Sequence, residues 1–594
     1  MQNEFLIVDR GSDIGAGFNS LELLMQGDFF SIYGNSGKDG LFSKVKVIID
    51  GYVLPNNSSN KEQINKYQAE LIDELYTKHG DNFPNYIKGL FTIIIVDNGT
   101  VKIFNDQLGV NKFFYFTAGN KFCFSNSYKL IVKASGQSRL NSEALATKSL
   151  LNREVNGHTL FSNIYYSVPA TKVVVTKDFV NISKYWDISL LLKNSNTQFD
   201  IEYFANLFKC NISNYNQSLK PEKTALTLTG GKDSRTALTA LLNAGVRPVG
   251  LTYGNPETID AVFASKLAAM AGIEHVIYNP TKTEEWFELE AKNIVDLNNP
   301  LINIHRSHRL YAIRMLAERL GNNTSFYTGY MGGELLMGVY FDNLIFTNFI
   351  RDFWIDGYSQ FNKIPALLQD RFIKTENLDI GLVKEQLGSL KTFDESLGKK
   401  GMQFHSLFEI GVLHHSQDIQ IAQHFLDYPL PFFLDFEFVN ALFSSQFSFL
   451  HRNVETKNLV KRHSLFEFNL KLQHIFYPAL DKAYYAKKGT YNTSEFLRGP
   501  LYWSAIRTMH YIMERKKYPP TFSYGQSYIL FLNKFLDEIA LDTASPINDI
   551  YNVPLALKSL KEQENLTTES TLHRYSNIVM HYMQYNKYTN QQLD

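Results

Sequence analysis

The sequence predicts an α/β protein of two domains, in which an α+β layered domain precedes a parallel-sheet domain with mainly helical additions. The chain has 594 residues, which is more than one ordinary hydrophobic core accommodates. Short apolar runs broken by glycine, asparagine and aspartate fill the first part of the chain. From Glu222 onward, strand and helix patterns alternate, as in parallel sheets. We therefore place the two domains at residues 1–195 and 196–594.

The first domain reads as strand-rich, with one helix. A helical repeat of apolar residues predicts a helix over Lys61–Lys78. The segment Lys193–Gln198 is polar and aperiodic, which is typical of a linker. Period-two and continuous apolar runs predict strands at Val45–Ile49, Phe91–Val96, Val101–Phe104 and Lys172–Val175.

The second domain begins with a strand, a glycine turn and a helix. The strand is expected at Thr224–Leu228 and the helix at about Ser234–Asn243. The pattern then repeats, and the chain after Gly338 is rich in aromatic residues at helical spacing, so we expect mainly helices there. The repeated units are a strand at Val249–Tyr253, a helix at Ile259–Ala271 and a strand at His275–Tyr278.

Composition narrows the function classes. Basic and acidic residues both number 59, so no net charge favours nucleic acid or an anionic membrane as a partner. The two cysteines, Cys123 and Cys210, suggest neither a disulfide framework nor a zinc site. The first residues lack the pattern of a signal peptide, and the apolar runs are far shorter than the ~20 residues of a membrane helix. We expect a cytoplasmic protein with no nucleic-acid and no membrane partner.

The strongest chemical signal is the loop Thr229–Ser234, which lies between the first predicted strand of the second domain and its helix. Glycines let backbone N–H groups approach an anion, and the helix N-terminus adds partial positive charge. Hydroxyls at both ends add donors. A carboxylate inside a phosphate-holding loop is repulsive unless it binds a metal, so Asp233 is expected to be a magnesium ligand. A plain tight turn between strand and helix is the alternative.

This loop resembles the S-G-G-x-D-S loop of the ATP-pyrophosphatases. Four further segments resemble the asparagine-synthetase branch in the same order: Leu251–Tyr253 with the helix to His275, Thr328–Leu335, Asp418–Asp435, and Pro478–Gly489. The resemblance implies a PP-loop domain that uses ATP and Mg²⁺ and releases AMP and pyrophosphate. The nucleotide-binding residues that it implies are Thr229, Gly230, Gly231, Asp233, Ser234, Leu251, Thr252 and Gly329.

The first domain resembles the glutamine amidotransferase half of the same family, which has an Ntn-hydrolase-like fold. The segments that match include Gly89–Phe91, Asn105–Gly109 and Tyr185–Asp187. Glutamine hydrolysis in that family uses an N-terminal cysteine as nucleophile, and position two here is Gln2. The arginine expected before Asp106 is replaced by Asn105. We interpret the domain as degenerate, retained as a scaffold.

The resemblance also implies residues for the amide-forming step. Tyr330 stands where β-lactam synthetases carry a tyrosine that assists deprotonation of the amine. Lys487 and Lys488 both compete for the lysine that stabilises charge on the adenylate and on the tetrahedral intermediate. Gly333 replaces an aspartate that shares magnesium in the family, for which Glu334 or Asp342 are candidate substitutes.

These observations predict an ATP-dependent ligase that adenylates a carboxylate and passes it to an amine. Carboxylate binding by Arg306 is a further hypothesis. Relatives that lack the cysteine include lasso-peptide cyclases, so macrolactam closure of a peptide is the leading interpretation, with a leader-peptide-binding protein and a protease as partners. The alternatives are an ammonia-dependent asparagine or small-molecule amide synthetase of the β-lactam type, and a nucleotide-binding scaffold without turnover.

Overall fold

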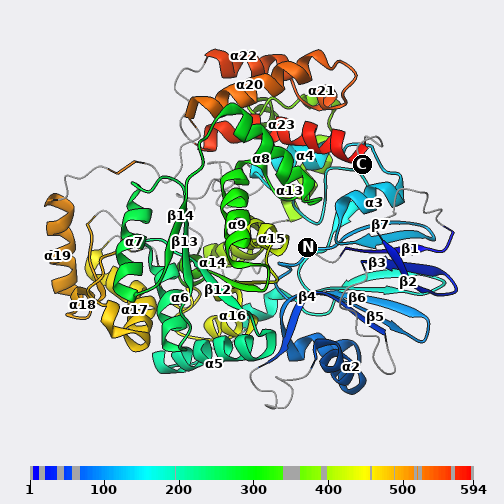
Figure 1. The fold of residues 1–594 in the computed structure, drawn as a ribbon. Coiled ribbons are helices and arrows are strands. Elements are labelled where there is room, and N and C mark those ends of the chain that lie inside the picture. The colour runs from blue at the N-terminus through cyan, green and yellow to red at the C-terminus, as the bar shows by residue number, and fades with distance from the viewer. Residues whose placement is uncertain are drawn as a thin grey trace.

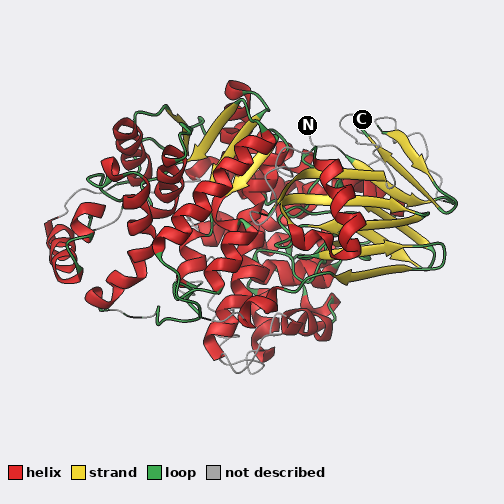
Figure 2. Cartoon of the chain, turned by 90° about the horizontal axis from the view of Figure 1, so that it is seen from below, coloured by secondary structure: helices red, strands yellow, loops and turns green. Residues whose placement is uncertain are grey.

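The computed structural model describes residues 4–11, 21–35, 46–56, 67–193, 196–338, 361–389, 398–454, 456, 458–486, 489–513, 518–519, 525–562 and 569–589. Two antiparallel sheets, stacked face to face, form the N-terminal part, and a parallel sheet surrounded by helices forms the rest (Figures 1 and 2). The predicted mixed α/β layered architecture is therefore confirmed at this level. Among the described helices, none has the length and apolar character needed to cross a bilayer.

The two antiparallel sheets have six and five strands. The first has the order β2-β3-β1-β8-β7-β9 and the second the order β11-β10-β6-β5-β4. Their bounds are β1 (Phe5–Asp9), β2 (Glu22–Gln26), β3 (Phe30–Gly34), β4 (Lys46–Pro55), β5 (Ile87–Asp97), β6 (Thr100–Asn105), β7 (Phe114–Ala118), β8 (Lys121–Ser125), β9 (Ile164–Tyr166), β10 (Thr171–Val175) and β11 (Val180–Lys184).

Strand β5 shows why the sequence reads there as a continuous apolar run. Ile94 and Val96 point into the core between the two sheets, where they meet residues of β1, β3 and β8 such as Ile7. Ile93 and Ile95 point to the other face, where they pack against helix α2 (Gln68–His79). Because both faces of the strand are covered, the usual polar alternation of an antiparallel strand is absent.

The parallel sheet has the order β14-β13-β12-β15-β16. All four neighbouring pairs are parallel, so the carboxyl ends of the strands meet at one edge. The strand order reverses on either side of β12, which is where open α/β sheets bind their ligands. The bounds are β12 (Lys223–Thr227), β13 (Val249–Tyr253), β14 (His275–Tyr278), β15 (Thr324–Thr328) and β16 (Tyr428–Pro431).

Helices cover both faces of this sheet and build the rest of the chain. Many begin at a side-chain cap, as α7 does where Thr258 accepts the Ala261 N–H at 3.3 Å. Their bounds are α5 (Ile201–Leu219), α6 (Lys232–Asn243), α7 (Ile259–Ala271), α8 (Glu284–Asp296), α9 (Ser307–Leu320), α10 (Gly332–Met337), α12 (Ile364–Gln369), α13 (Ile380–Ser389), α14 (Gly398–His405), α15 (Leu413–Gln423), α16 (Phe436–Phe443), α17 (Leu459–Phe476), α18 (Thr493–Phe496) and α19 (Pro500–Met513).

The C-terminal helices tie the two parts together. They are α20 (Gly525–Leu541), α21 (Ile547–Ile550), α22 (Val553–Glu562) and α23 (Glu569–Thr589). One continuous apolar core joins them to α8 and to two helices of the N-terminal part, α3 (Tyr128–Ser135) and α4 (Ser142–Leu151). The described C-terminal end accordingly lies beside α3 (Figure 1).

Most sequence-predicted elements are present, although several begin or end at other residues than predicted, as β5 does at Ile87 and Asp97 and β12 at Lys223 and Thr227. Helix α2 begins at Gln68, so the predicted start at Lys61 is wrong for Tyr67, whose backbone is extended, while residues 61–66 lie outside the described part. Helix α6 begins two residues earlier than predicted, at Lys232. Elements β13, α7 and β14 have the predicted bounds, and the described chain after Gly338 is mainly helical. The division at residue 195 stays a prediction, because residues 194–195 are not described.

Candidate active site

The loop Thr229–Ser234 joins β12 to α6 at the carboxyl edge of the parallel sheet. The Thr229 hydroxyl lies 3.0 Å from the Ser234 hydroxyl and accepts the Gly231 N–H at 3.2 Å. The N-cap residue of α6 is Gly231, which has no side chain to cap the helix. The first N–H groups of a helix have no intrahelical partner, so those of α6 can donate to an anion placed at the loop.

Two glycines allow neighbouring segments to approach this loop. A Cβ atom on Gly329 would lie 2.7 Å from the backbone nitrogen of Ser234. A Cβ atom on Gly230 would lie 2.2 Å from the Cβ of Ala486, whose N–H donates to the Gly230 carbonyl at 2.9 Å. Glycine is needed at both positions, because any side chain would separate the three segments.

A second contact holds the segment before Lys487 against α6. The buried Arg235 side chain donates to the carbonyls of Ala483 (2.5 Å) and Tyr484 (2.6 Å). Lys487 and Lys488 themselves lie outside the described residues. The structure thus brings the residue that precedes them, Ala486, onto the glycine loop.

The loop also contains one member of a pair of half-buried carboxylates, Asp233 and Glu334. Burial raises the pKa of Glu334 to about 7, and the nearby charge of Asp233 adds to the effect. Burial likewise raises the pKa of Asp233, although the Asn469 amide, which donates to it at 2.9 Å, lowers it in part. Two neighbouring carboxylates, one of which raises the pKa of the other through its charge, are suited to binding a cation.

Asp233 and Glu334 fit a Mg²⁺ site in which the protein supplies only a few of the ligands. Magnesium is commonly held by one or two carboxylates, with water and substrate phosphate oxygens completing its shell. Asp233 and Glu334 supply two carboxylates next to the phosphate loop, and within the described ranges no group of three or more metal-ligating side chains gathers. A Cβ on Gly333 would lie 3.4 Å from Asp233, and Asp342 lies outside the described residues.

Tyr330 follows β15 and donates a hydrogen bond to the carboxylate of Asp418. Its hydroxyl also lies 3.3 Å from that of Tyr253, at the end of β13. Burial, followed by the charge of Asp418, raises the pKa of the Tyr330 phenol well above its ordinary value. The phenol is therefore protonated at neutral pH and is oriented by the carboxylate.

Asp418 is a residue that sequence reasoning did not assign to the site. Burial by itself would raise its pKa, but the guanidinium groups of Arg306 and Arg309 lower it below the ordinary value. Arg306 contacts Asp418 at 3.2 Å, and Arg309 binds its second oxygen. The carboxylate that Arg306 binds here is thus one of the chain's own, in contrast to the hypothesis of a substrate carboxylate. No local spacing signals this pairing, because it depends on α9 packing beside α15.

Leu251 and Thr252 lie in β13, beside the loop. The Thr252 hydroxyl donates to the Leu228 carbonyl at 2.5 Å and lies 2.8 Å from the His275 ring. Leu251 is buried in the core, and its carbonyl accepts the Leu228 N–H at 2.8 Å. Both side chains make contacts within the sheet. Any contact of this strand end with a nucleotide would therefore come from its backbone, and this contact stays a prediction.

In the N-terminal part, residues of the predicted amidotransferase motif form hydrogen bonds within the fold. The Asn105 amide donates to the Val168 carbonyl at 3.0 Å and accepts the Thr171 N–H at 2.7 Å. Cys123 is buried in β8, and burial raises the pKa of its thiol to about 12, while Cys210 is exposed on α5. Neither thiol is activated as a nucleophile. Gln2 lies outside the described residues.

Sequence comparison finds a family match in this N-terminal part of the chain. Residues 57–186 match a family of glutamine amidotransferase domains. No curated protein matches the chain. Among solved structures, NMN synthetase from Francisella tularensis is similar at 15% identity over 37% of this chain and 97% of that one, with a TM-score of 0.21. Glutamine phosphoribosylpyrophosphate amidotransferase from B. subtilis, complexed with ADP and GMP, is similar at 13% identity over 55% of this chain and 76% of that one, also with a TM-score of 0.21. At these values neither structure carries an argument about this chain.

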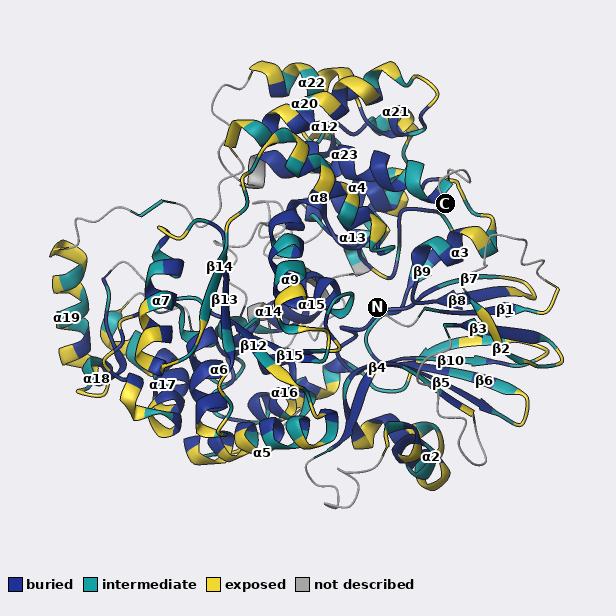
Figure 3. Ribbon diagram, viewed as in Figure 1, coloured by how far each residue is buried: buried dark blue, intermediate teal, exposed yellow. Residues whose placement is uncertain are grey.

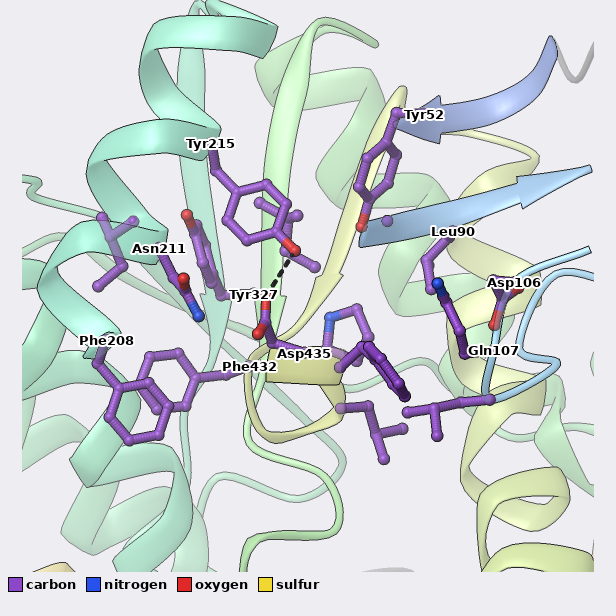
Figure 4. Close-up of a pocket in the computed structure, with 17 residues that line it drawn as sticks. Tyr52, Leu90, Asp106, Gln107, Phe208, Asn211, Tyr215, Tyr327, Phe432 and Asp435 are labelled. Carbon is purple, nitrogen blue, oxygen red and sulfur yellow. Dashed lines mark hydrogen bonds between the residues drawn. The ribbon is translucent and has the colours of Figure 1, made fainter. Parts of the chain in front are cut away.

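A pocket lies between this amidotransferase-like domain and the parallel-sheet domain, and residues of both line it (Figure 4). Tyr215 donates to Asp435 across one wall at 3.0 Å, and Tyr52 of β4 donates to the Pro429 carbonyl at 2.7 Å. Lys88 of β5 is fully buried and forms an ion pair with Glu437 at 2.5 Å. None of the candidate nucleotide or catalytic residues lines this cavity. The interface therefore fixes the two domains together through buried polar contacts.

Proposed function

We propose that the protein is an ATP-dependent carbon–nitrogen ligase that converts a carboxylate into its adenylate and then into an amide. The observation that carries the proposal is the pair of half-buried carboxylates, Asp233 and Glu334, beside a glycine loop at the N-terminus of α6. This arrangement suits a magnesium-bound phosphate chain. The match of residues 57–186 to glutamine amidotransferase domains supports an amide-forming enzyme.

In the first step, a carboxylate oxygen of the substrate attacks the α-phosphorus of ATP, and the bond to the β-phosphate bridge oxygen breaks. The loop Thr229–Ser234 holds the departing pyrophosphate through N–H and hydroxyl donors. Asp233 and Glu334 would hold Mg²⁺, which would supply positive charge to neutralise the phosphates. The products of this step are an acyl-adenylate and pyrophosphate.

In the second step, an amine nitrogen attacks the acyl carbon and AMP departs. The Tyr330 oxygen receives a proton from the attacking nitrogen as its own proton shifts toward Asp418. Asp418 orients the phenol through this hydrogen bond and accepts the proton that Tyr330 passes on. A cation from Lys487 or Lys488 stabilises the negative charge of the tetrahedral intermediate.

The amine comes from ammonia or from the substrate itself, since neither cysteine of the chain is placed to hydrolyse glutamine. Our specific proposal is closure of a macrolactam in a lasso-type peptide, with a leader-peptide-binding protein and a protease as partners. An ammonia-dependent asparagine or β-lactam-type synthetase is the second candidate. The absence of the family aspartate at Gly333 favours a third, a nucleotide-binding scaffold without turnover.

The test is carboxylate-dependent exchange of labelled pyrophosphate into ATP, followed by measurement of AMP. Peptides that carry a free amine and an acidic side chain, aspartate with ammonia, and carboxyethylated amino acids serve as alternative substrates. A ligase shows exchange with one class and then forms its amide. Binding of ATP without exchange for any class would favour the scaffold.

A further inference from the structure

Helix α15 lies in the centre of the molecule beside α9, and several of its polar side chains are buried (Figure 3). Gln417, Asp418 and Gln420 are 5%, 1% and 4% exposed, and Ser416 is buried too. Polar side chains are rarely found in a protein interior unless hydrogen bonds compensate for the loss of water. The partners of these side chains come from segments far apart in the chain, on both sides of the helix.

On one side, α15 meets a loop of the amidotransferase-like domain. The Gln423 amide donates to the side-chain oxygen of Asn111 at 3.0 Å, and the Gln420 amide donates to the Val110 carbonyl at 3.2 Å. The loop is itself held in place, because Asp106 accepts the N–H groups of Val110 and Asn111 and the Asn111 residue is buried. The surface that this domain offers to α15 is therefore well fixed.

On the other side, α15 meets the residues assigned to the amide-forming step. It carries Asp418, which accepts the hydrogen bond of Tyr330. The Gln417 side-chain oxygen accepts the Asn303 N–H at 3.1 Å, at the start of the turn η4 (Ile304–Arg306). The last residue of this turn contacts Asp418 at 3.2 Å. One short helix thus connects the loop of the first domain to the Tyr330 phenol.

The geometry of a helix links these two sides. Asp418 precedes Gln420 by two residues, so at about 100° per residue the two side chains point to roughly opposite faces of α15. Intrahelical hydrogen bonds keep the helix rigid, so a displacement of the face that contacts the loop also displaces the carboxylate. Near reacting groups, a displacement of about 1 Å can slow a reaction by about a hundredfold.

We propose that the amidotransferase-like domain positions Asp418 for the amide-forming step. Its loop, residues 106–111, holds α15 through Gln420 and Gln423 and thereby keeps the carboxylate aligned with its phenol donor. The inference rests on the proposed ligase function and goes beyond it, because it gives this domain a role in the reaction. Gln420 and Gln423 are positioning residues, since they act only through Asp418. Adenylation does not use Asp418, so only the amide-forming step depends on them.

The test compares two rates on one preparation of the full-length protein, amide formation and pyrophosphate exchange, with whichever of the substrates named above supports exchange. Gln420→Leu/Gln423→Leu removes both donors at similar side-chain volume, and we expect amide formation to fall about tenfold relative to exchange. The ratio cancels any loss of folded protein. Asn111→Ala removes an acceptor from the other side and should lower the ratio too. The matched control, Tyr52→Phe, removes a hydrogen bond of 2.7 Å between the domains that does not involve α15, and it should leave the ratio unchanged.

Hydrogen–deuterium exchange tests the same contact without any substrate. In the Gln420→Leu/Gln423→Leu protein, the backbone amides of α15 are expected to exchange about tenfold faster than in the wild type, while Tyr52→Phe leaves them unchanged. Unchanged exchange over α15 would overturn the inference. Equal falls of amide formation and pyrophosphate exchange would also overturn it, because general destabilisation lowers both rates alike. A wild-type protein without pyrophosphate exchange would refute the ligase proposal, and the hydrogen-exchange comparison would still decide whether the loop holds α15.

Discussion

The amidotransferase-like domain and the carboxyl edge of the parallel sheet differ in how their polar side chains are paired. In the first, Asn105 forms hydrogen bonds within the domain, and Asp106, whose pKa burial raises to about 6, accepts the N–H groups of Val110 (2.9 Å) and Asn111 (2.8 Å). At the sheet edge, Asp233 and Glu334 lie close together; partial burial raises both pKa values, and the charge of Asp233 raises that of Glu334 further. Mutually satisfied groups stabilise a fold, whereas repelling carboxylates destabilise it unless a ligand compensates. We therefore place the proposed active site at the carboxyl edge of the parallel sheet.

The largest expected effect is at Asp233. Asp233→Asn removes one of the two carboxylates of the pair, so we expect no substrate-dependent AMP while the protein stays folded. AMP release and the circular dichroism melting curve measure the two properties. Asp178→Asn, at an exposed position of the amidotransferase-like domain, is the control and should keep full turnover. A folded Asp233→Asn protein with wild-type turnover would move the active site elsewhere.

Asp418→Asn is expected to affect stability strongly. Removal of its charge takes away the carboxylate that the buried Arg306 and the half-buried Arg309 both contact, at a cost of about 3–5 kcal/mol. Because the folded pKa of Asp418 lies below its ordinary value, its contribution is present above about pH 4 and is lost as the pH falls through the folded pKa. Urea unfolding of wild type and variant should therefore differ at pH 7 and converge in acid.

The control for that measurement lies in the other domain. Asp187 pairs with Lys184 at 3.3 Å, and the two side chains are 47% and 41% exposed. Asp187→Asn should cost less than about 1 kcal/mol, since solvent screens the pair. Equal costs for the two variants would contradict the assigned burial of Asp418.

The next largest effect is expected at Lys487 and Lys488, which follow Ala486. Loss of a cation that acts only in the transition state costs ~3 kcal/mol, roughly a hundredfold in turnover, with little change in the KM for ATP. We expect this result for Lys487→Met or for Lys488→Met. Full turnover in both variants would exclude a lysine from this segment as the stabilising cation.

Tyr330→Phe should separate the two chemical steps. It removes the phenol that receives the amine proton, so amide formation should slow by about a hundredfold. Pyrophosphate exchange should persist, because adenylation does not use the phenol. The two rates are measured on one preparation, and an equal loss of both would make Tyr330 a structural residue.

The smallest expected effect is at the amidotransferase-like domain. Cys123→Ser should leave ligase turnover unchanged, because the thiol is buried in β8 and its pKa is raised to about 12. Neither protein should release ammonia from glutamine. Ammonia release above the rate without enzyme, lost in Cys123→Ser, would make the domain an active glutaminase and end the contrast between the two regions.

Local sequence patterns predicted the structure correctly where neighbouring residues determine it. The order of strand, glycine turn and helix around Thr229–Ser234 follows from periodicity and from residue types, and β13, α7 and β14 have the bounds that the pattern predicts. The helix predicted from Lys61 is an instructive failure, because apolar spacing continued past Tyr67, where the backbone is extended. Periodicity records which side chains face the core but does not record where the helix begins.

Sequence alone therefore determined the layered α/β class, the phosphate-type loop and Asp233 as a carboxylate in an unusual place. Tertiary structure decided which distant residues meet them: Glu334 beside Asp233, Asp418 beneath Tyr330, and Ala486 against Gly230. These pairings join segments far apart in the chain, and they depend on how α9, α10, α15 and α17 pack around the sheet. Such packing arises from the sum of many non-local apolar contacts, which leave no periodic trace in any single segment.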